Sequence, residues 1–383
     1  MSGCVRWSPP VMDTSDAGSC RSASLRWVSP ADADERERLA SWCRGVGGAV
    51  IQPAPAAVEA PALADITFVS WNVHVGNGDI RAFVRDLRAG LHTGNRRVAH
   101  FILMLQEVAR TEGVPPFADD VSGAARISAP AGADIDIVRI SRELGLSLIY
   151  VPSMRNGNSP GDPAADRGSA ILSTVPLSEP AAIELPGERQ RRVVIVAKLA
   201  ATSVGVIHLD ALGGAKRLWG LWTPWMREVQ VRSLDGLLDG DPLVLGADLN
   251  TWHGSNERAV RVLSTLRRAT PASPERHGLG LRVLDYLFFR AGEDRRAQYR
   301  QIPQRYGSDH RPLIGWIEEV PILAQPATRG LDVGTCMGHE PPEVPGLIEP
   351  SEMHQFVDQD VVADGVRHQD QAPVKADVSR RRT

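Results

Sequence analysis

Six short segments between residues 70 and 312 place polar, chemically active side chains within or at the ends of apolar runs. Carboxylates, amides and imidazoles recur in them, and such groups can hold a hard divalent cation, activate water and neutralise a phosphate. The segments are Ser70 to Asn72, Leu105 to Glu107, His208 to Asp210, Gly246 to Asn250, Leu284 to Phe288, and Ser308 to Pro312. Their order and composition predict an active site that hydrolyses phosphoesters.

Three of the oxygen-bearing side chains are candidate metal ligands. Asn72 and Glu107 each end an apolar run that is typical of a buried strand, so both are expected at the rim of a sheet. Asp309 is the third candidate. Oxygen ligands suit Mg²⁺ or Mn²⁺ rather than zinc. Taken alone, Asn72 also fits a turn at a strand end, and Glu107 also fits a solvated surface position.

Asp248 and Asn250 follow an apolar run that ends at Gly246. Because side chains two residues apart lie on one side of an extended chain, both are expected to face the same way. The carboxylate of Asp248 can then orient and deprotonate water, while the amide of Asn250 binds phosphate. The alternative is an Asx-type turn, in which these side chains bond only to the nearby backbone.

Two imidazoles and a carboxylate complete the candidate site. His208 ends a predicted strand and can donate a hydrogen bond to phosphate; a structural histidine is the alternative. His310 directly follows Asp309, and its ring is expected to face phosphate. Asp285 interrupts an apolar strand, which is costly without a partner, and an imidazolium at His310 would be a suitable partner. A solvent contact at a strand end is the alternative for Asp285.

The ordered segments resemble the endonuclease/exonuclease/phosphatase superfamily, which includes pancreatic-type deoxyribonucleases, abasic-site endonucleases, sphingomyelinases and inositol-polyphosphate 5-phosphatases. The similarity runs from about Ile66 to Ile317, and the matching stretches are SWN, LQE, GSAILS, HLD, GADLN, LDYLF and SDHRP. The resemblance implies an α/β fold, a four-layer αββα sandwich of two mixed β-sheets flanked by helices. It also implies a site at one rim of the paired sheets.

The resemblance assigns the metal and water roles to specific residues. Glu107 becomes the principal Mg²⁺ ligand, with Asn72 and Asp309 close by. Asp248 becomes the residue that positions or activates water, and Asn250 becomes a phosphate ligand.

The histidines take the remaining roles that the resemblance implies. His208 contacts phosphate or the leaving group, and His310, oriented by Asp285, stabilises the pentacovalent transition state. A phosphodiester is favoured over a monoester, because an alkoxide leaving group benefits from a nearby proton donor and His208 can be one in addition to His310.

Arginines are the candidate contacts for the rest of the substrate. Those placed at the site itself are Arg167, Arg192 and Arg311. The net charge of −3 gives no overall basic field for nucleic acid, although local groups of arginines can still bind a polyanion. One such group comprises Arg290, Arg295, Arg296, Arg300, Arg305 and Arg311, and another comprises Arg189, Arg191 and Arg192. Solvated strand edges are the alternative, because acidic neighbours dilute both groups.

Three functions remain open from the sequence. The first is a phosphodiesterase or endonuclease acting on nucleic acid. The second is a phosphatase or lipid phosphodiesterase, similar to inositol-phosphate phosphatases or sphingomyelinases; Trp219, Trp222 and Trp225 fit either an apolar lip for such a substrate or helix core. The third is a catalytically silent binding module, against which the intact carboxylates argue. Nothing in the sequence indicates a protein partner.

The chain is expected to divide into five parts. Residues 1–23 are polar and irregular, and residues 321–383 contain seven prolines and one aromatic side chain, so both are expected to be disordered. Residues 24–51 predict a strand and a helix, and residues 52–64 predict a Pro/Ala linker. Residues 65–320 predict the catalytic domain, in which short strands alternate with helices.

Cysteine positions and apolar runs bear on the compartment. None of the four cysteines lies between residues 44 and 335, so the catalytic region has no disulfide or thiolate metal site of its own, although the flanks can carry disulfides. No apolar run reaches the length of a membrane span, and residues 1–23 lack a signal-peptide core. A cytoplasmic location is therefore expected, unless a different start site adds an export signal.

Overall fold

The computed structural model describes parts of residues 1–323, which form one compact unit. The described stretches are residues 11–13, 20–21, 24–53, 61–116, 135–157, 162–187, 190–211, 219–238, 243–251, 254–267, 276–277, 282–290 and 295–319. The expected tail at residues 321–383 and most of the expected linker, residues 54–60, lie outside these stretches.

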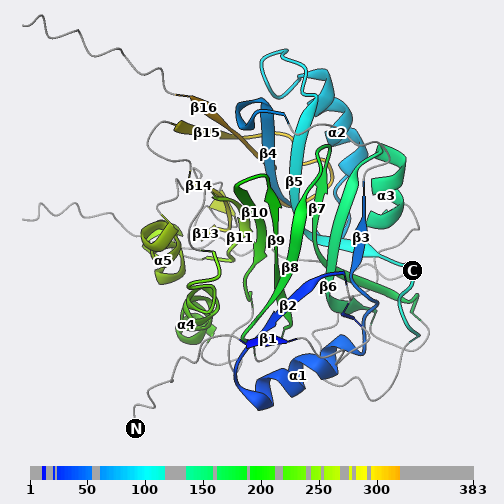
Figure 1. Cartoon of the computed structure of the whole chain (residues 1–383), viewed down its shortest axis with the longest axis vertical. Coiled ribbons are helices and arrows are strands. Elements are labelled where there is room, and N and C mark those ends of the chain that lie inside the picture. Colours follow the sequence, from blue (N-terminus) through cyan, green and yellow to red (C-terminus); the bar gives the residue numbers. More distant parts are fainter. Residues whose placement is uncertain are drawn as a thin grey trace, which may run out of the picture. The chain divides into compact units, whose positions relative to one another are not determined.

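Two mixed seven-stranded sheets form the centre of the described structure (Figure 1). In order across the first sheet, the strands are β1 (Val11–Asp13), β2 (Arg26–Ser29), β8 (Ser178–Leu185), β9 (Arg192–Leu199), β10 (Thr202–His208), β11 (Leu243–Asp248) and β14 (Asp285–Arg290). In order across the second sheet, they are β15 (Arg295–Gln301), β16 (Leu313–Glu319), β4 (Ile66–Asn72), β5 (His100–Arg110), β7 (Ala165–Ser173), β6 (Ser147–Asn156) and β3 (Val50–Gln52). A separate small hairpin joins β12 (Arg276–His277) to β13 (Arg282–Val283).

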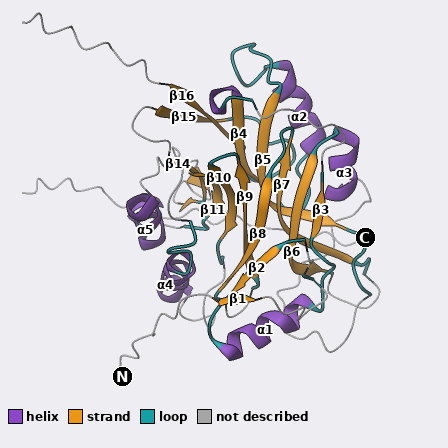
Figure 2. Ribbon diagram, in the orientation of Figure 1, coloured by secondary structure: helices purple, strands orange, loops and turns teal. Residues whose placement is uncertain are grey.

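Helices flank the two sheets (Figure 2). Helices α2 (Ile80–Ala89) and α3 (Ile137–Leu144) pack on the second sheet, while α4 (Trp219–Arg232) and α5 (Arg258–Arg267) pack on the first. Helix α1 (Ala33–Cys43) belongs to the N-terminal extension. None of the helices in the described stretches is long and apolar enough to cross a membrane.

Three apolar cores separate these layers. The central core lies between the sheets and includes Phe68 of β4 and Phe289 of β14, whose ring centroids are 6.2 Å apart. A second core lies beneath α2 and α3, and a third lies beneath α4 and α5. This layering confirms the predicted four-layer αββα sandwich.

Helix α2 illustrates how local sequence sets these elements. The Asp79 carboxylate accepts a hydrogen bond from the backbone N–H of Ala82 at 2.9 Å, which caps the first turn. Gly90 ends the helix in the left-handed conformation with φ 86°, where a side chain would be strained. The buried face of the helix consists of Ile80, Phe83, Val84 and Leu87. The spacing of these apolar residues in the sequence therefore matches the buried face of the helix.

Three strands differ from their sequence predictions. Strand β5 continues to Arg110, because a bulge absorbs the polar residues after Leu105 instead of ending the strand. Strand β8 was not predicted, since its small residues and buried Glu184 do not form an apolar run. Asp285 begins β14 rather than interrupting a longer strand, because the ladder breaks after Val283.

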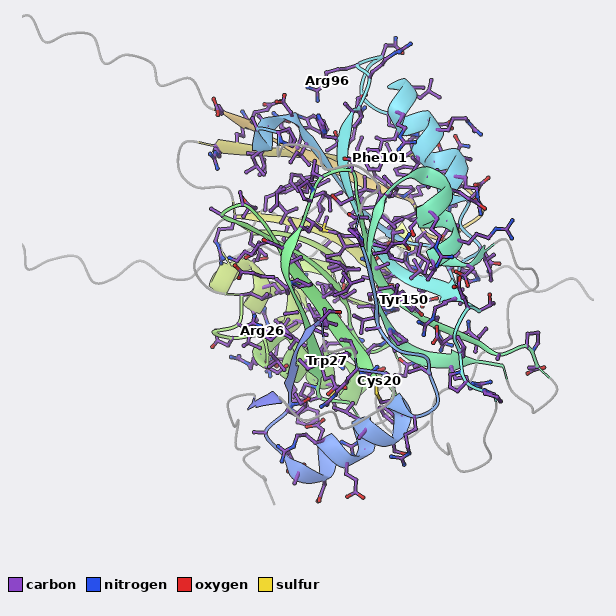
Figure 3. All side chains as sticks on the ribbon, turned by 45° about the vertical axis from the view of Figure 1, so that its right-hand side comes forward. Cys20, Arg26, Trp27, Arg96, Phe101 and Tyr150 are labelled. Carbon is purple, nitrogen blue, oxygen red and sulfur yellow. A yellow bond between two sulfur atoms is a disulfide. The ribbon has the colours of Figure 1, made fainter. Side chains whose placement is uncertain are left out.

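The N-terminal extension is part of the sandwich. Strand β2 adds to the first sheet beside β8, and a disulfide joins Cys20 to Cys43 at the end of α1 (Figure 3). The expectation of disorder across residues 1–23 is therefore wrong for residues 11–13, which pair with β2, and for Cys20, which is buried. The partners of these residues lie 14 to 23 positions further along the sequence.

A buried ion-pair network explains how β2 is held. The Glu184 carboxylate accepts hydrogen bonds from Arg21 at 2.9 Å, Ser29 at 2.6 Å and Arg191 at 2.8 Å. Both arginine guanidinium groups also lie over the Trp27 ring, 5.5 Å and 5.8 Å from a ring centroid. Arg191 is therefore committed to the fold and unable to take part in the predicted polyanion site.

Gly246 lets the two sheets approach each other just before Asp248. A Cβ atom at this position would lie 2.8 Å from Met104 of β5 and 3.0 Å from Ser70 of β4. Contacts this short would force the sheets apart. The glycine thus allows the end of β11 to reach the end of β4, where the candidate site lies.

Candidate active site

One side of the site is a row of residues across three adjacent strands of the first sheet. His208 at the end of β10 is the register partner of Asp248 on β11, and Asp248 is the register partner of Asp285 on β14. Side chains that share a row face the same way. The sheet therefore gathers residues separated by up to 77 positions, and it sets two carboxylates opposite each other.

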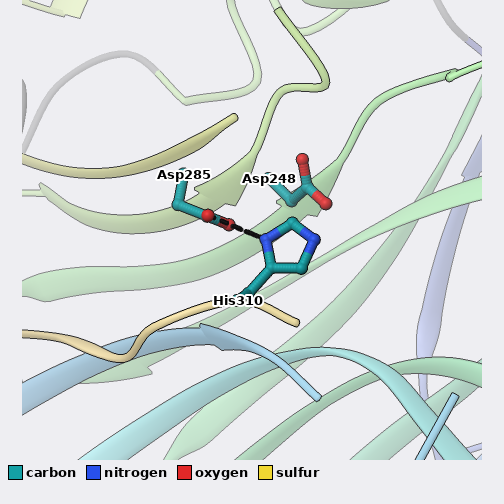
Figure 4. A group of neighbouring side chains, drawn as sticks. All are labelled: Asp248, Asp285 and His310. Atoms are coloured by element: carbon teal, nitrogen blue, oxygen red, sulfur yellow. Dashed lines mark hydrogen bonds and ion pairs between the residues drawn. The ribbon is translucent and has the colours of Figure 1, made fainter. Parts of the chain in front are cut away.

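His310 neutralises that pair of carboxylates from the second sheet's side. Its Nδ1 atom lies 2.8 Å from Asp285 Oδ2, and Asp248, Asp285 and His310 each bring a possible ligand atom within 4.8 Å of the others (Figure 4). Burial alone would lower the pKa of His310, but the charge and hydrogen bonds of Asp285, supported by Asp248 and Asp309, raise this pKa to about 10. His310 is therefore an imidazolium at neutral pH.

Asp248 is a buried carboxylate with oriented hydrogen bonds. Asn72 Nδ2 donates to its Oδ2 at 2.7 Å, and the backbone N–H of Asn250 donates to its Oδ1 at 2.9 Å. Burial raises the pKa of Asp248 to about 6, against the lowering effect of His310. A carboxylate with this pKa is ionised at neutral pH and is a stronger base than an exposed aspartate.

His208 is held as a neutral hydrogen-bond donor. Arg192 Nη1 lies 2.9 Å from His208 Nδ1, and because a guanidinium only donates, Nδ1 must accept and Nε2 must carry the proton. Burial, followed by the charges of Arg192 and His310, holds the pKa of His208 well below its usual value. Its Nε2 atom points towards the acids, 3.5 Å from Asp248 Oδ2 and 3.8 Å from Glu107 Oε1.

Glu107 lies at the bulge in β5, with a positive φ of 56°. The bulge directs this carboxylate to the rim, where its side chain is 22% exposed. Arg167 of β7 is buried nearby; burial lowers the pKa of Arg167 to about 10, while the charge of Glu107 acts in the opposite direction. The prediction that Glu107 ends a strand was wrong, although the side chain does reach the rim.

The oxygen atoms of Glu107 and Asn72 fit a hard cation better than the compact cluster of two aspartates and a histidine does. The latter, Asp248, Asp285 and His310, already forms an internal ion pair, and an imidazolium has no lone pair for a metal. Glu107 keeps a partly exposed carboxylate, and Asn72 Oδ1 accepts a hydrogen bond from the backbone N–H of His74 at 2.9 Å. Both are oxygen ligands of the type that Mg²⁺ prefers.

Asp309 lies at the exposed edge of the site. Its side chain is 56% exposed, and its Oδ1 atom lies 2.7 Å from His74 Nδ1 and 3.8 Å from His310 Nε2. His74 was missed by sequence reasoning, although its position two residues after Asn72 is a usable signal. Ser308 was also given no role; its hydroxyl donates to the Asn72 carbonyl oxygen at 2.7 Å and accepts from the His310 N–H at 3.0 Å.

The remaining candidates divide between the site and the sheet edges. Asn250 donates from its amide to the Leu209 carbonyl oxygen at 3.1 Å and has a positive φ of 51°, and Arg311 is half-buried beside His310. Arg295 and Arg296 lie on the edge strand β15 opposite Glu319 and Glu318. That register favours the solvated-edge interpretation. Of the three tryptophans, only the side chain of Trp225 is described, and it is half-buried.

The model of the Endonuclease/Exonuclease/phosphatase family matches residues 69–310. No curated protein matches the chain. Among solved structures, an endonuclease/exonuclease/phosphatase from Beutenbergia cavernae DSM 12333 is 18% identical, with coverage of 66% of this chain and 71% of that one and a TM-score of 0.46. The human Nocturnin catalytic domain is 14% identical, with coverages of 71% and 98% and a TM-score of 0.42. Sphingomyelinase C from Streptomyces griseocarneus is 15% identical, with coverages of 65% and 98% and a TM-score of 0.35.

Proposed function

We propose that this chain, which belongs to the endonuclease/exonuclease/phosphatase family, is a metal-dependent hydrolase of phosphodiesters. The observation that carries the proposal is the buried Asp248 carboxylate beside the His310 imidazolium. A base and a fixed positive charge at one point are what water needs to attack an anionic phosphate.

Asp248 orients the attacking water and accepts its proton. Asn72 and the Asn250 N–H fix both carboxylate oxygens, so the base is positioned before substrate arrives. The water oxygen forms the new bond to phosphorus as the bond to the ester oxygen breaks, and the ester oxygen leaves as an anion that takes a proton from the solvent. This role predicts that Asp248→Asn keeps the fold and loses turnover.

The two histidines stabilise the negative charge that develops on the phosphate. His310 is cationic and fixed through Nδ1 by Asp285, which leaves Nε2–H to donate to a phosphate oxygen. His208 donates from Nε2 as a neutral group. His208 was expected to protonate the leaving group, but its lowered pKa and the Arg192 contact keep it neutral. His208 therefore supports a phosphodiester only as a hydrogen-bond donor near the leaving oxygen.

Glu107 and Asn72 would hold a Mg²⁺ or Mn²⁺ ion, with Arg167 and Arg192 providing buried positive charge beside them. The ion would supply Lewis-acid polarisation of a phosphoryl oxygen. Asp309 was also expected to bind the metal, but its contact with His74 supports a different role.

The positions of the arginines support binding of the scissile phosphate more than binding of a long nucleic-acid strand along the surface. Arg191 is buried in an ion pair, and the edge arginines of β15 face glutamates. A nucleic acid is therefore one phosphodiester to test, beside sphingomyelin and small diesters. Inositol phosphates and p-nitrophenyl phosphate test the monoester alternative.

The test is a substrate panel assayed with Mg²⁺ or Mn²⁺, using plasmid DNA, RNA, sphingomyelin, bis-p-nitrophenyl phosphate and the monoesters. We expect diester turnover that falls at least about 100-fold in Asp248→Asn. A folded wild-type chain without activity on any phosphoester would refute the proposal and favour a binding module. Faster turnover of the monoesters would instead assign a phosphatase.

A further inference from the structure

A second aspartate–histidine pair lies at the mouth of the site. Asp309 Oδ1 is 2.7 Å from His74 Nδ1, and the two side chains are 56% and 47% exposed. The same Asp309 oxygen is 3.8 Å from His310 Nε2. A single carboxylate therefore separates the His74 ring from the imidazolium that faces the phosphate.

The backbone holds His74 in an unusual conformation. His74 and Val75 have consecutive positive φ angles of 48° and 54°, and for a β-branched valine such an angle is an outlier. The N–H of His74 donates to Asn72 Oδ1 at 2.9 Å, and its carbonyl oxygen accepts from the Asn77 backbone N–H at 3.0 Å and side-chain amide at 2.8 Å. Hydrogen bonds on both sides thus fix the backbone of His74 relative to Asn72.

Folding stability does not account for this arrangement. A contact as exposed as His74–Asp309 contributes little to stability, because water competes for both side chains. Two non-glycine residues in the left-handed region destabilise the folded state. Val75 is buried, so packing can offset the strain at that residue, whereas the His74 side chain is 47% exposed. Strain that is kept at an exposed residue beside the candidate site points to a role for His74 in substrate binding.

We propose that His74 is a substrate-contacting residue, oriented by Asp309, that binds the ester substituent beyond the scissile phosphate. The carboxylate of Asp309 accepts the proton of Nδ1, which leaves the Nε2 edge of the ring to face the substrate. Asp309 then acts through His74 and not as a metal ligand. This inference rests on the proposed phosphodiesterase activity and adds a binding determinant to it.

The experiment is a double-mutant cycle with bis-p-nitrophenyl phosphate as substrate and Mn²⁺ as the cation. The variants are His74→Asn, Asp309→Ala and the double variant; asparagine tolerates a positive φ, so the loop is preserved. His100→Asn, at the other end of β5 from Glu107, is the matched control. Calorimetric titration with Mn²⁺ in the absence of substrate gives a readout that is independent of turnover.

We expect both single variants and the double variant to raise KM by a similar factor of about ten, with kcat within about threefold of wild type, because one substrate hydrogen bond is lost in each. Mn²⁺ affinity should be unchanged, and His100→Asn should resemble wild type. A wild-type KM in His74→Asn would refute the inference. Weakened Mn²⁺ binding in Asp309→Ala alone would also refute it and would restore Asp309 as a metal ligand.

Failure of this inference is separable from failure of the proposed function. Wild-type turnover, with Asp248→Asn as the inactive reference, tests the phosphodiesterase activity. If the wild type is active and His74→Asn has the same KM and kcat as the wild type, only the role of His74 is rejected.

Discussion

Asp285→Asn is the change that should separate charge from shape most clearly. The substitution keeps the size of the side chain that His310 contacts at 2.8 Å but removes its charge. Without that charge, the lowering effect of burial is less opposed, and the pKa of His310 falls from about 10 towards its usual value of 6.5. At pH 8 the imidazole should then be neutral, and kcat should fall by roughly 100-fold or more, as it does when preorganised charge stabilisation is lost.

The same pair should stabilise the fold in a pH-dependent way. Because the pKa of His310 is raised from 6.5 to about 10 in the folded state, the stabilisation is complete below pH 6.5 and is lost as pH rises through about 10. The raised pKa corresponds to roughly 5 kcal/mol at pH 6 and roughly 1.4 kcal/mol at pH 9. Loss of one partner of a buried pair typically costs about 3–5 kcal/mol, which agrees with the value at pH 6.

Urea unfolding of wild type and Asp285→Asn at pH 6 and pH 9, followed by tryptophan fluorescence, measures this effect. We expect the difference in unfolding free energy to be largest at pH 6 and to shrink several-fold at pH 9. An equal difference at both pH values would show that His310 is not charged by Asp285. Normal kcat at pH 8 in the folded variant would refute its catalytic role.

Three further predictions concern the metal, the extension and the tail. Excess EDTA should abolish hydrolysis, and full activity in the presence of EDTA would exclude a catalytic metal. Glu107→Ala should raise the Mg²⁺ concentration needed for half-maximal activity by at least about tenfold, because an anionic ligand is lost. Cys43→Ala should lower the unfolding free energy by about 3 kcal/mol, because it opens a covalent loop between residues 23 positions apart. Calorimetry measures this difference, and an intact-mass measurement checks that the wild-type disulfide is present. An unchanged unfolding free energy would show that the bond does not form. Deleting residues 321–383 should leave kcat and the melting temperature almost unchanged, because their composition provides little apolar surface to bury; a large drop in melting temperature would show that they dock.

Sequence reasoning worked where one local rule placed a side chain. The expectation that His310 needs a carboxylate and that Asp285 needs a cation predicted their contact across 25 residues. Apolar runs also placed Asn72, Asp248 and His208 at or near strand ends, and sheet pairing brought them together. In these cases burial and polarity in the sequence determine both the strand and its end.

The positions that were wrong or missed depend on pairing between distant segments. The bulge at Glu107 exists only because β5 pairs with β7, and no local signal separates it from a strand end. The contact of Arg192 with His208 is an exception, because it could have been predicted from neighbouring strands. An antiparallel hairpin of β9 and β10 brings the start of β9 beside the end of β10. The pairing of β1 with β2 and the Cys20–Cys43 disulfide could not be derived, since neither leaves an apolar period in the sequence.

The site is also an electrostatic link between the two sheets. Asp248 and Asp285 are register partners on adjacent strands of the first sheet, and like charges in that position repel. The cation that relieves this repulsion, His310, comes from the loop before β16 of the second sheet, where Trp71 donates to its carbonyl oxygen at 3.2 Å. The first sheet alone therefore carries an unfavourable pair of carboxylates, and the pair becomes favourable only when the sandwich closes. It follows that the charge arrangement proposed for catalysis forms together with the central core, so core variants that loosen the sheets should lose activity before they unfold.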